Sequence, residues 1–306
     1  MRKVLFFVII SIIPFTIVGQ NKGNTSSFEE ALKEPKKVKS LHLVCKDTLN
    51  LMKEAEKLIN LESLYLNECK LESLPIGVEK MKNLRLLNVQ DNNLSSLPLQ
   101  LKELQKITVV NLRNNNFRNF PEILLELPLL REIDLSGNSK LELSKATYAL
   151  TKIENLDFLY LNNNDITILP KTISNFQKIK ELHLSKNPHI NLIECFKILS
   201  QLKTLKILAL ANNNIRIIPT EIKLMLQLNG LVLDNNPNIE IMESIARIGQ
   251  LKNLKVLLMR NSKLNVLPKN LNILKRLSVL ELSGNNFSEE EKSRIKTALP
   301  NTKVIF

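Results

Sequence analysis

The chain has 306 residues, of which 44% are hydrophobic and 24% charged, a composition typical of a folded rather than a disordered protein. With no Trp, 5% aromatic residues and 7 Gly, it offers little for a stacking platform for single-stranded nucleic acid or for glycine-rich phosphate loops. Three His and three Cys leave little material for a metal cluster or a disulfide framework. The formal net charge is +13, and because the lysines are scattered singly we interpret them as a solvated surface.

Residues 1–19 are typical of an export signal. Arg2 and Lys3 form a basic start, residues 4–18 form an apolar run, and Gly19 is a small residue suited to cleavage. The apolar run is shorter than the about 20 residues that a membrane-spanning helix needs. The sequence therefore predicts a signal peptide over residues 1–19, with a membrane tether through the uncleaved segment as the alternative. Residues 20–27 are predicted to be a flexible tail.

Residues 28–37 are predicted to form an N-terminal cap. Ser27 and Glu30 fit a capping box, in which the serine side chain accepts a hydrogen bond at the start of a helix. Pro35 then ends the helix, because the residue before a proline disfavours helical backbone. A short helix over residues 28–33 follows from this pattern.

From residue 38 to residue 287 one pattern, L-x-x-L-x-L-x-x-N-x-L, returns eleven times. The units open at Val38, Leu61, Leu84, Ile107, Leu130, Leu156, Ile179, Leu205, Leu228, Leu254 and Leu277. Successive openings are 23 or 26 residues apart, and from the fifth unit the two lengths alternate, which indicates duplication of an ancestral pair. Regular spacing over most of the chain predicts a stack of coils rather than a globular core.

Each unit is predicted to be one coil that begins with a short strand. In the unit that opens at Leu84, Leu87 and Val89 alternate with polar or outward residues, and this period of two is typical of a strand. The 23-residue units continue into a Leu-Pro type turn such as Leu97-Pro98, whereas the 26-residue units contain a helix-like stretch such as residues 239–248. Eleven parallel strands at about 4.8 Å spacing would give a sheet about 50 Å long.

The recurrent asparagine is predicted to be structural, because a buried amide must be hydrogen-bonded. It occupies one interior position in most units: Asn92, Asn115, Asn138, Asn164, Asn187, Asn213, Asn236 and Asn285. Cys69 and Ser262 take the same position in two units, so we interpret Cys69 as a ladder residue. A disulfide between Cys45 and Cys69 stays open as an alternative, since spacing alone does not establish it. Cys195 falls on the convex return of its unit, where it is expected to pack.

Residues 288–306 are predicted to close the stack. Ser288 and Glu291 form a second capping box, which predicts a helix that ends near Leu299. Residues 304–306 follow Pro300 and are suited to a final strand. A cap at each end is needed because a solenoid otherwise exposes its core.

These motifs resemble the leucine-rich repeat family over residues 28–306. The 23-residue units are similar to its typical and Ras-associated subclasses, and residues 31–38 with the C-terminal cap resemble exported bacterial members. The resemblance implies an α/β solenoid, a horseshoe with a parallel concave sheet of about eleven strands and an irregular or helical convex side. It also implies protein binding on the concave face, without a cofactor. The cysteine-rich caps of secreted animal members, and the ubiquitin-ligase and GTPase domains of other members, are missing, so their roles are not carried over.

Two patches are predicted on the concave face, where the third and fifth positions of each unit should project. The first comprises Glu132, Asp134, Phe158, Tyr160, Glu181 and His183. Its aromatic anchors and acids suit a partner segment that carries Lys or Arg. The second comprises Ile207, Ala209, Val232, Val256 and Leu258, and an exposed apolar area of this kind usually marks a contact site. The alternative for the first patch is a generic solvated face, and the alternative for the second is that each coil merely tolerates apolar residues that point outward.

The sequence favours a non-enzymatic, monomeric module that binds a protein or peptide in the cell envelope or extracellular space. His183 could lie near Asp134 or Glu181, but no nucleophile, zinc or Walker motif accompanies it. We therefore expect no catalytic residue, cofactor, metal site or nucleic acid partner. Two alternatives remain. One is an intracellular signalling scaffold resembling Ras-binding leucine-rich repeat proteins. The other is a binder of anionic envelope glycolipid or polysaccharide through basic edges.

Overall fold

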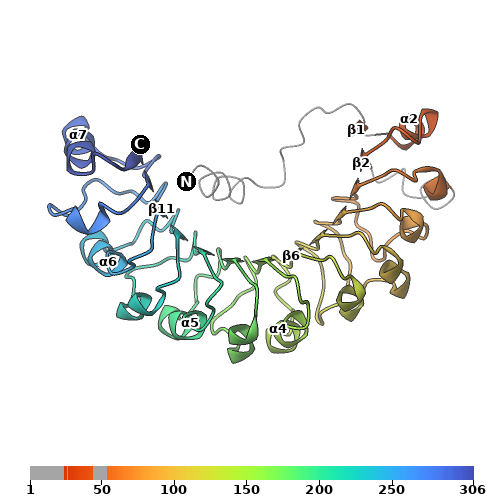
Figure 1. Ribbon diagram of the computed structural model, residues 1–306, viewed down its shortest axis with the longest axis horizontal. Coiled ribbons are helices and arrows are strands. Elements are labelled where there is room, and N and C mark those ends of the chain that lie inside the picture. Colours follow the sequence, from red (N-terminus) through yellow and green to blue (C-terminus); the bar gives the residue numbers. More distant parts are fainter. Residues whose placement is uncertain (1–23, 26, 44–53) are drawn as a thin grey trace. The chain divides into compact units, whose positions relative to one another are not determined.

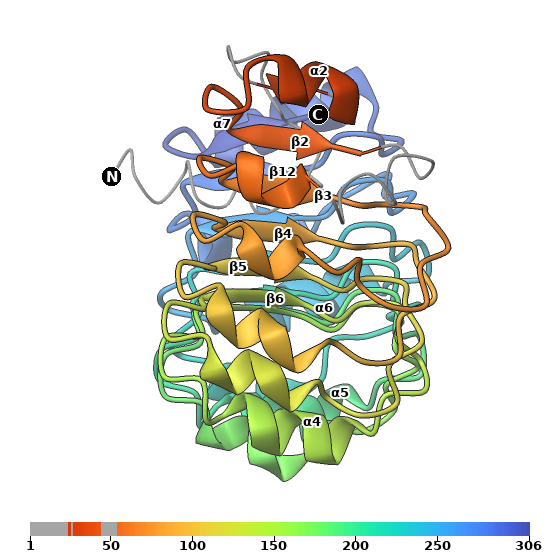
Figure 2. The same cartoon turned by 90° about the vertical axis from the view of Figure 1, so that its right-hand side faces the viewer.

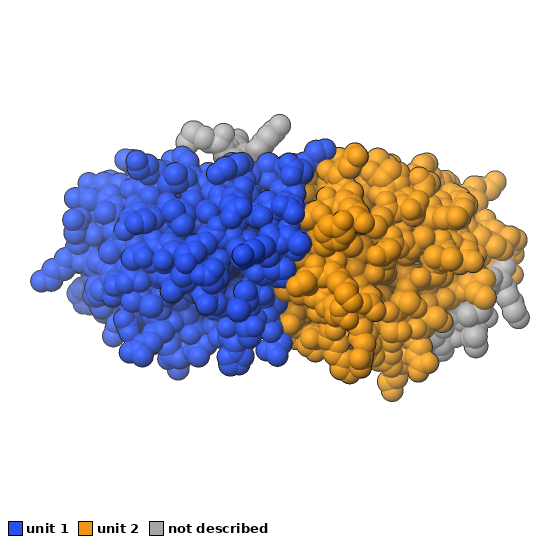
Figure 3. All heavy atoms as spheres, turned by 90° about the horizontal axis from the view of Figure 1, so that it is seen from below, with its two compact units in different colours: residues 1–12, 165–306 blue, residues 13–164 orange. Residues whose placement is uncertain are grey.

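The computed structural model describes residues 24–25, 27–43 and 54–306. The predicted signal peptide, most of the predicted tail and Cys45 lie outside these residues. The contacts within the chain divide it into two compact units, shown in different colours in Figure 3. The N-terminal unit comprises the described residues up to Asn164, and the C-terminal unit comprises Asp165–Phe306.

The N-terminal unit alternates strands with helices or short 3-10 turns. Its strands are β1 (Asn24–Thr25), β2 (Ser40–His42), β3 (Ser63–Tyr65), β4 (Leu86–Asn88), β5 (Val109–Asn111), β6 (Glu132–Asp134) and β7 (Phe158–Tyr160). Its helical segments are α2 (Phe28–Lys33), η2 (Ala55–Lys57), η3 (Val78–Lys80), η4 (Leu99–Glu103), η5 (Glu122–Glu126) and α4 (Leu143–Leu150).

The C-terminal unit repeats the same order. Its strands are β8 (Glu181–His183), β9 (Ile207–Ala209), β10 (Gly230–Val232), β11 (Val256–Leu258), β12 (Val279–Glu281) and β13 (Lys303–Ile305). Its helical segments are η6 (Lys171–Asn175), α5 (Leu192–Leu199), η7 (Thr220–Leu224), α6 (Ile241–Ile248), η8 (Asn272–Leu274) and α7 (Glu289–Ala298). The α-helices α4, α5 and α6 belong to the 26-residue coils and the 3-10 turns to the 23-residue coils, because the three extra residues allow a longer return.

Within each unit the strands pair in parallel and in chain order, with no shift of register from one coil to the next. Figure 2 shows β2–β6 as successive rungs of one stack. In each unit the strands lie on the concave side and the helices and 3-10 turns on the convex side (Figure 1). The solenoid of leucine-rich coils that the sequence predicts is confirmed. Beyond the eleven repeat strands, the predicted final strand is present as β13. At the other end β1 pairs with β2, which corrects the prediction of a flexible tail for residues 24–25.

The repeated leucines form the interior of the coils. In the coil that opens at Leu84, the side chains of Leu84, Leu87, Val89 and Leu94 are fully buried. Fully burying each such side chain stabilises the fold by about 1.5–3 kcal/mol before conformational entropy is counted. Since every coil repeats this set, the stack is held together by apolar contacts between neighbours.

The asparagine ladder is present as a chain of side-chain to backbone hydrogen bonds. The amide nitrogen of Asn138 donates to the carbonyl oxygens of Leu112 and Leu135, each at 3.0 Å, and its Oδ1 accepts from the Phe117 nitrogen at 3.2 Å. Asn236 makes the equivalent bonds to Leu210 and Leu233. These hydrogen bonds confirm the predicted structural role of the asparagine side chains.

The residue before each ladder position has a left-handed backbone, which turns the chain out of the sheet. Asp91, Asn114 and Gly137 have φ values of 58°, 50° and 71°. A Cβ atom added at Gly137 would lie 1.8 Å from Oδ1 of Asn114, so a larger residue there would displace the asparagine side chain. Gly284 has the same relation to Asn261, at 1.9 Å.

Each end of the described stack carries a capped helix. Ser27 accepts a hydrogen bond from the Glu30 nitrogen at the start of α2, and Ser288 accepts one from the Glu291 nitrogen at the start of α7. The helix α7 ends at Ala298, and β13 pairs with β12 one residue earlier than the sequence indicated. No helix in the described part of the chain has the length and apolar character to cross a membrane.

The cysteines have different environments. Cys69 is disulfide-bonded, and Cys45, its partner in the alternative that the sequence left open, lies outside the described residues. The backbone nitrogen of Cys69 also donates to Oδ1 of Asn92 at 3.0 Å, as its ladder position requires. Cys195 is free and fully buried on α5, and burial raises the pKa of its thiol. It is therefore a packing residue, not a nucleophile.

Candidate binding surface

The strand face opposite the coil interior brings four predicted residues of the first patch together. Glu132 and Asp134 flank the buried Ile133 on β6, and the register places Glu132 beside Phe158 and Asp134 beside Tyr160 on β7. Glu132, Phe158 and Tyr160 are half-buried, so part of each side chain stays accessible. Because the strands are hydrogen-bonded, these side chains stand on a rigid base.

Asp134 has a structural task that the sequence pattern did not indicate. Its carboxylate Oδ1 accepts a hydrogen bond from the Ser136 nitrogen at 2.8 Å, and the side chain is 7% exposed. Asn88 and Asn111 close the ends of β4 and β5 in the same way, accepting from Gln90 and Arg113. In these coils the side chain at the fifth position of the repeat therefore caps the end of the strand. Glu132 is thus the more accessible acid of the patch.

Glu181 and His183 belong to the C-terminal unit and form a pair of their own on β8. Nε2 of His183 lies 3.5 Å from Oε2 of Glu181, and the two residues are 6% and 3% exposed. In the register Glu181 is beside Ile207 and His183 beside Ala209. Of the six residues predicted to project as one patch, Asp134, Glu181 and His183 are buried, which corrects that prediction. Four of the six lie in one unit and two in the other.

The second predicted patch is present as a contiguous apolar cluster on the sheet face of the C-terminal unit. It comprises Ile207, Ala209, Val232, Val256, Leu258 and Val279. The prediction that this cluster is exposed is wrong, because its members are only 3–7% exposed. The in-register strands set these side chains side by side, so that they pack against one another.

An ion pair lies next to this cluster at the ends of β10 and β11. The carboxylate of Asp234 accepts from the backbone nitrogen of Arg260 at 2.7 Å and from its guanidinium at 2.6 and 2.9 Å. These hydrogen bonds raise the pKa of Arg260 above its usual value. The ion pair holds both side chains in place, so the charge of Arg260 has a structural role on this face.

An aromatic stack near the start of the N-terminal unit was missed by sequence reasoning. His42 and Tyr65 occupy the fifth position of adjacent coils, and their rings are stacked at 3.9 Å with an angle of 8° between the planes. Burial lowers the pKa of His42 and raises that of Tyr65, so both rings are held in their neutral forms at neutral pH. The sequence signal for this stack was that His42 and Tyr65 occupy the same position of adjacent repeats.

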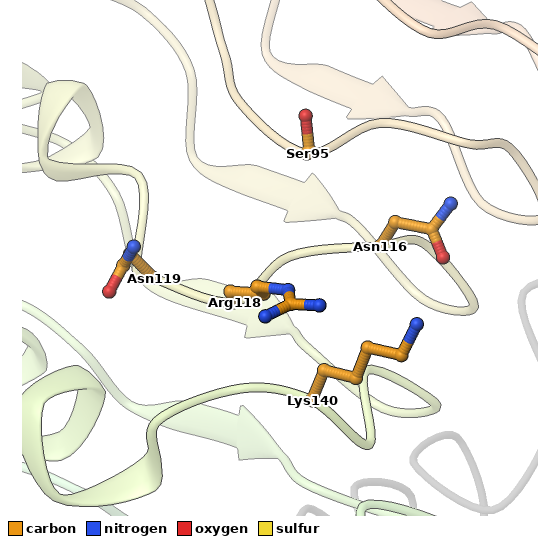
Figure 4. Close-up of a pocket in the computed structure, with 5 residues that line it drawn as sticks. All are labelled: Ser95, Asn116, Arg118, Asn119 and Lys140. Atoms are coloured by element: carbon orange, nitrogen blue, oxygen red, sulfur yellow. The ribbon is translucent and has the colours of Figure 1, made fainter.

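A hollow of about 450 Å³ lies on the loop side of the N-terminal unit (Figure 4). Its lining residues are Ser95, Asn116, Arg118, Asn119 and Lys140, and all of them are exposed. The corresponding arginine of the C-terminal unit, Arg216, is held by Glu240 at 2.8 Å. Within the described residues no group of three or more His, Cys, Asp or Glu side chains is placed to hold a metal ion.

One strand per coil, an interior of repeated leucines and an asparagine ladder define a solenoid repeat protein with a broad sheet face. The fold is that of leucine-rich repeat proteins. The Leucine Rich Repeat family model matches residues 155–176, which is about one coil. No curated protein matches the chain.

Three solved structures show what the chain is similar to. An internalin (inlF) from Listeria monocytogenes is 21% identical, with 82% of this chain and 75% of that chain covered and a TM-score of 0.54. TLR13, solved in complex with ssRNA13, is 21% identical with a TM-score of 0.58; 90% of this chain is covered, but only 40% of TLR13. The Leptospira interrogans protein LIC12759 is 24% identical over 94% of this chain and 100% of its own, with a TM-score of 0.44. At these identities the likeness shows the fold alone.

Proposed function

We propose that the protein is a non-enzymatic module that binds a protein or peptide on its sheet face. The observation that carries this proposal is the juxtaposition of half-buried Phe158 and Tyr160 with Glu132 on β6 and β7. Aromatic side chains with part of their surface accessible on a rigid base are the residues that contribute most to protein interfaces. We call Glu132, Phe158 and Tyr160 the aromatic patch.

The charge of the aromatic patch favours a partner segment that carries Lys or Arg. Glu132 and Asp134 stand on either side of Ile133 on β6, beside Phe158 and Tyr160, so the two acids contribute a negative field at the rings. The same field disfavours phosphate groups. Although the TLR13 neighbour was solved with a single-stranded RNA, we therefore propose a basic peptide segment rather than nucleic acid for this face.

We also propose that the protein acts outside the cytosol, in the cell envelope or extracellular space. The basic, apolar and small-residue pattern of residues 1–19 supports this, as does the disulfide at Cys69, because structural disulfides persist in oxidising compartments. Mass determination of the protein from fractionated cells tests the proposal. A chain cleaved near Gly19 in an exported fraction is expected, and an intact Met1 in the cytosol would reject export.

Peptides selected on the wild-type protein from a random displayed library are expected to carry Lys or Arg beside apolar residues. Their affinity for a Phe158→Ala/Tyr160→Ala variant should fall at least tenfold, since truncation of one central aromatic anchor costs about 2 kcal/mol or more. Titration calorimetry with the selected peptides measures the change. Glu132→Gln should weaken the basic peptides more than neutral ones.

Tyr148→Ala is the matched control, because Tyr148 lies on the convex helix α4 and is 57% exposed. It should leave peptide affinity unchanged. Thermal unfolding of each variant separates lost binding from lost folding. Selected peptides that bind the Phe158/Tyr160 variant as tightly as the wild type would contradict binding at the aromatic patch.

A further inference from the structure

Cations that are far apart in the sequence lie on one side of the C-terminal unit, the side on which the chain enters each strand. Lys203 lies in the turn before β9 and Lys206 directly before that strand, and Lys252 and Lys255 hold the same places before β11. Lys275 and Arg276 form the turn before β12. Because the strands are parallel and in register, residues that precede them share one side of the sheet. We call these six residues the basic edge.

The basic edge has a fixed backbone. The Gly230 nitrogen donates to the Lys206 oxygen at 2.9 Å, and the Ser278 nitrogen donates to the Lys255 oxygen at 2.7 Å. Amide side chains add further links, since Asn229 donates to the Asn253 oxygen at 3.0 Å. Successive coils are about 4.8 Å apart, so Lys206 and Lys255, two strands apart, are separated by about 10 Å along the edge.

The basic edge is not neutralised by its surroundings. Residues 200–206, 224–229, 249–255 and 272–278, which form this side of four successive coils, contain no Asp or Glu. Its five lysines are exposed, and none of the six cations has an ion-pair partner among the described residues. Lys255 donates only to the carbonyl oxygen of Arg276, at 3.3 Å.

The corresponding side of the N-terminal unit is different, because several of its cations are paired between coils. Lys39 contacts Glu62 at 2.8 Å, Lys82 contacts Glu103 at 3.2 Å, and Arg131 is bound by Asp157. The two units share one fold and one register, so the fold does not require an acid-free edge. The C-terminal unit therefore has a row of cations whose charge is available to a partner.

We propose that the basic edge binds a linear acidic polysaccharide, whose repeated sulfate or carboxylate groups meet the cations coil by coil. A row of charges on successive coils matches an extended chain of regularly spaced anions. The four segments contain no aromatic residue and no His on which a nucleotide base could stack, which disfavours single-stranded nucleic acid. This site is independent of the aromatic patch, which lies in the N-terminal unit.

The test measures binding of heparin to the full-length exported chain by titration calorimetry at several salt concentrations. A quadruple variant, K203Q/K206Q/K252Q/K255Q, is expected to bind at least tenfold more weakly than the wild type and to show a smaller salt dependence. The matched control, K39Q/K57Q/K80Q/K82Q, removes the same charge from paired lysines of the N-terminal unit and should weaken binding less than twofold.

Replacement of the same four edge lysines by Arg should retain binding, because the charge stays in place. Equal weakening by the edge variant and the control would overturn the proposal, since it would show an effect of net charge alone. So would a wild-type protein that does not bind heparin, or one that binds an oligothymidylate or vesicles with anionic lipid more tightly than heparin. The edge variant should keep its affinity for peptides selected on the aromatic patch, so failure here and failure of that proposal are distinguishable.

Discussion

Replacement of Asn138 by Ala is expected to lower the free energy of unfolding by about 3–4 kcal/mol. The side chain is 1% exposed and bonds the carbonyl oxygens of Leu112, Leu135 and Ser136 and the nitrogen of Phe117. Alanine would leave these backbone groups without this partner inside a coil that water does not reach, and each unsatisfied buried group costs about 1–3 kcal/mol. Urea unfolding followed by circular dichroism measures the loss.

Asn138→Ser should lie between the wild type and the alanine variant. Ser262 occupies the same ladder position, where its hydroxyl donates to the Arg260 oxygen at 3.1 Å and accepts from the Asn236 nitrogen at 3.2 Å. A hydroxyl therefore satisfies some of the backbone groups that an amide satisfies. The control is Asn116→Ala, at an exposed residue one coil away, with an expected change below about 0.5 kcal/mol.

A similar small loss for Asn138→Ala and Asn116→Ala would contradict a structural ladder. It would mean that the coil relaxes to let water or other donors reach the freed carbonyl groups. The same loss for Ser and Ala at position 138 would show that the hydroxyl found at Ser262 works only in that coil. Either result would change how the recurrent asparagine is understood.

The fold could be predicted because one chemical requirement is repeated in every coil. An apolar residue at each opening position has to be buried, and an amide such as Asn236 has to bond the backbone of the preceding coil, so spacing alone reveals the stack. The α-helical returns of the 26-residue coils follow from the same spacing.

The sheet face could be predicted only in part, because side-chain function there depends on neighbours in other coils. The sequence placed Phe158 and Tyr160 beside Glu132, but it did not show that Asp134 caps its own strand or that Leu258 is buried. The burial of Leu258 comes from contacts with neighbouring strands, which no single unit of the pattern contains, whereas the Asp134 cap is a local contact with the Ser136 nitrogen.

The lysines were interpreted as scattered because they are single in the sequence. Lys203 and Lys252 are 49 residues apart, as are Lys206 and Lys255, and this is the length of one 23-residue and one 26-residue coil together. Folding converts that period into a row on one side of the C-terminal unit. The signal was present, but it is visible only when charge is compared at equal positions of the repeat.

The second large effect is expected at the C-terminal cap, where Arg294→Ala should lower the free energy of unfolding by about 2–3 kcal/mol. The Arg294 guanidinium donates to the Leu267 oxygen at 2.9 Å and to Glu291 at 2.7 Å. Glu291 in turn accepts from the Leu267 nitrogen at 2.8 Å. The two side chains therefore fasten α7 to the coil that opens at Leu254, the tenth of the eleven repeats.

Glu291 makes this effect depend on pH. The hydrogen bond from Arg294 holds the pKa of the Glu291 carboxyl below its usual value near 4.5. The ionised carboxylate stabilises the folded state above that usual value, and the contribution is lost as the pH falls through the lower pKa of the folded protein. Glu291→Gln should therefore cost about 1 kcal/mol at pH 7, with the difference from the wild type vanishing in more acidic solution.

A double-mutant cycle at pH 7 measures the coupling between the two side chains, and we expect a coupling of about 1 kcal/mol or more. The control pair is Glu289 and Lys292 on the same helix, where Glu289 is largely exposed and Glu289→Gln should change stability by less than about 0.5 kcal/mol. Hydrogen exchange locates the effect, since loss of the clamp should first unprotect the amides of β12 and β13. If Arg294→Ala left both the global stability and this exchange unchanged, α7 would be held by its apolar contacts at Ile295 and Leu299 alone, both of which are buried.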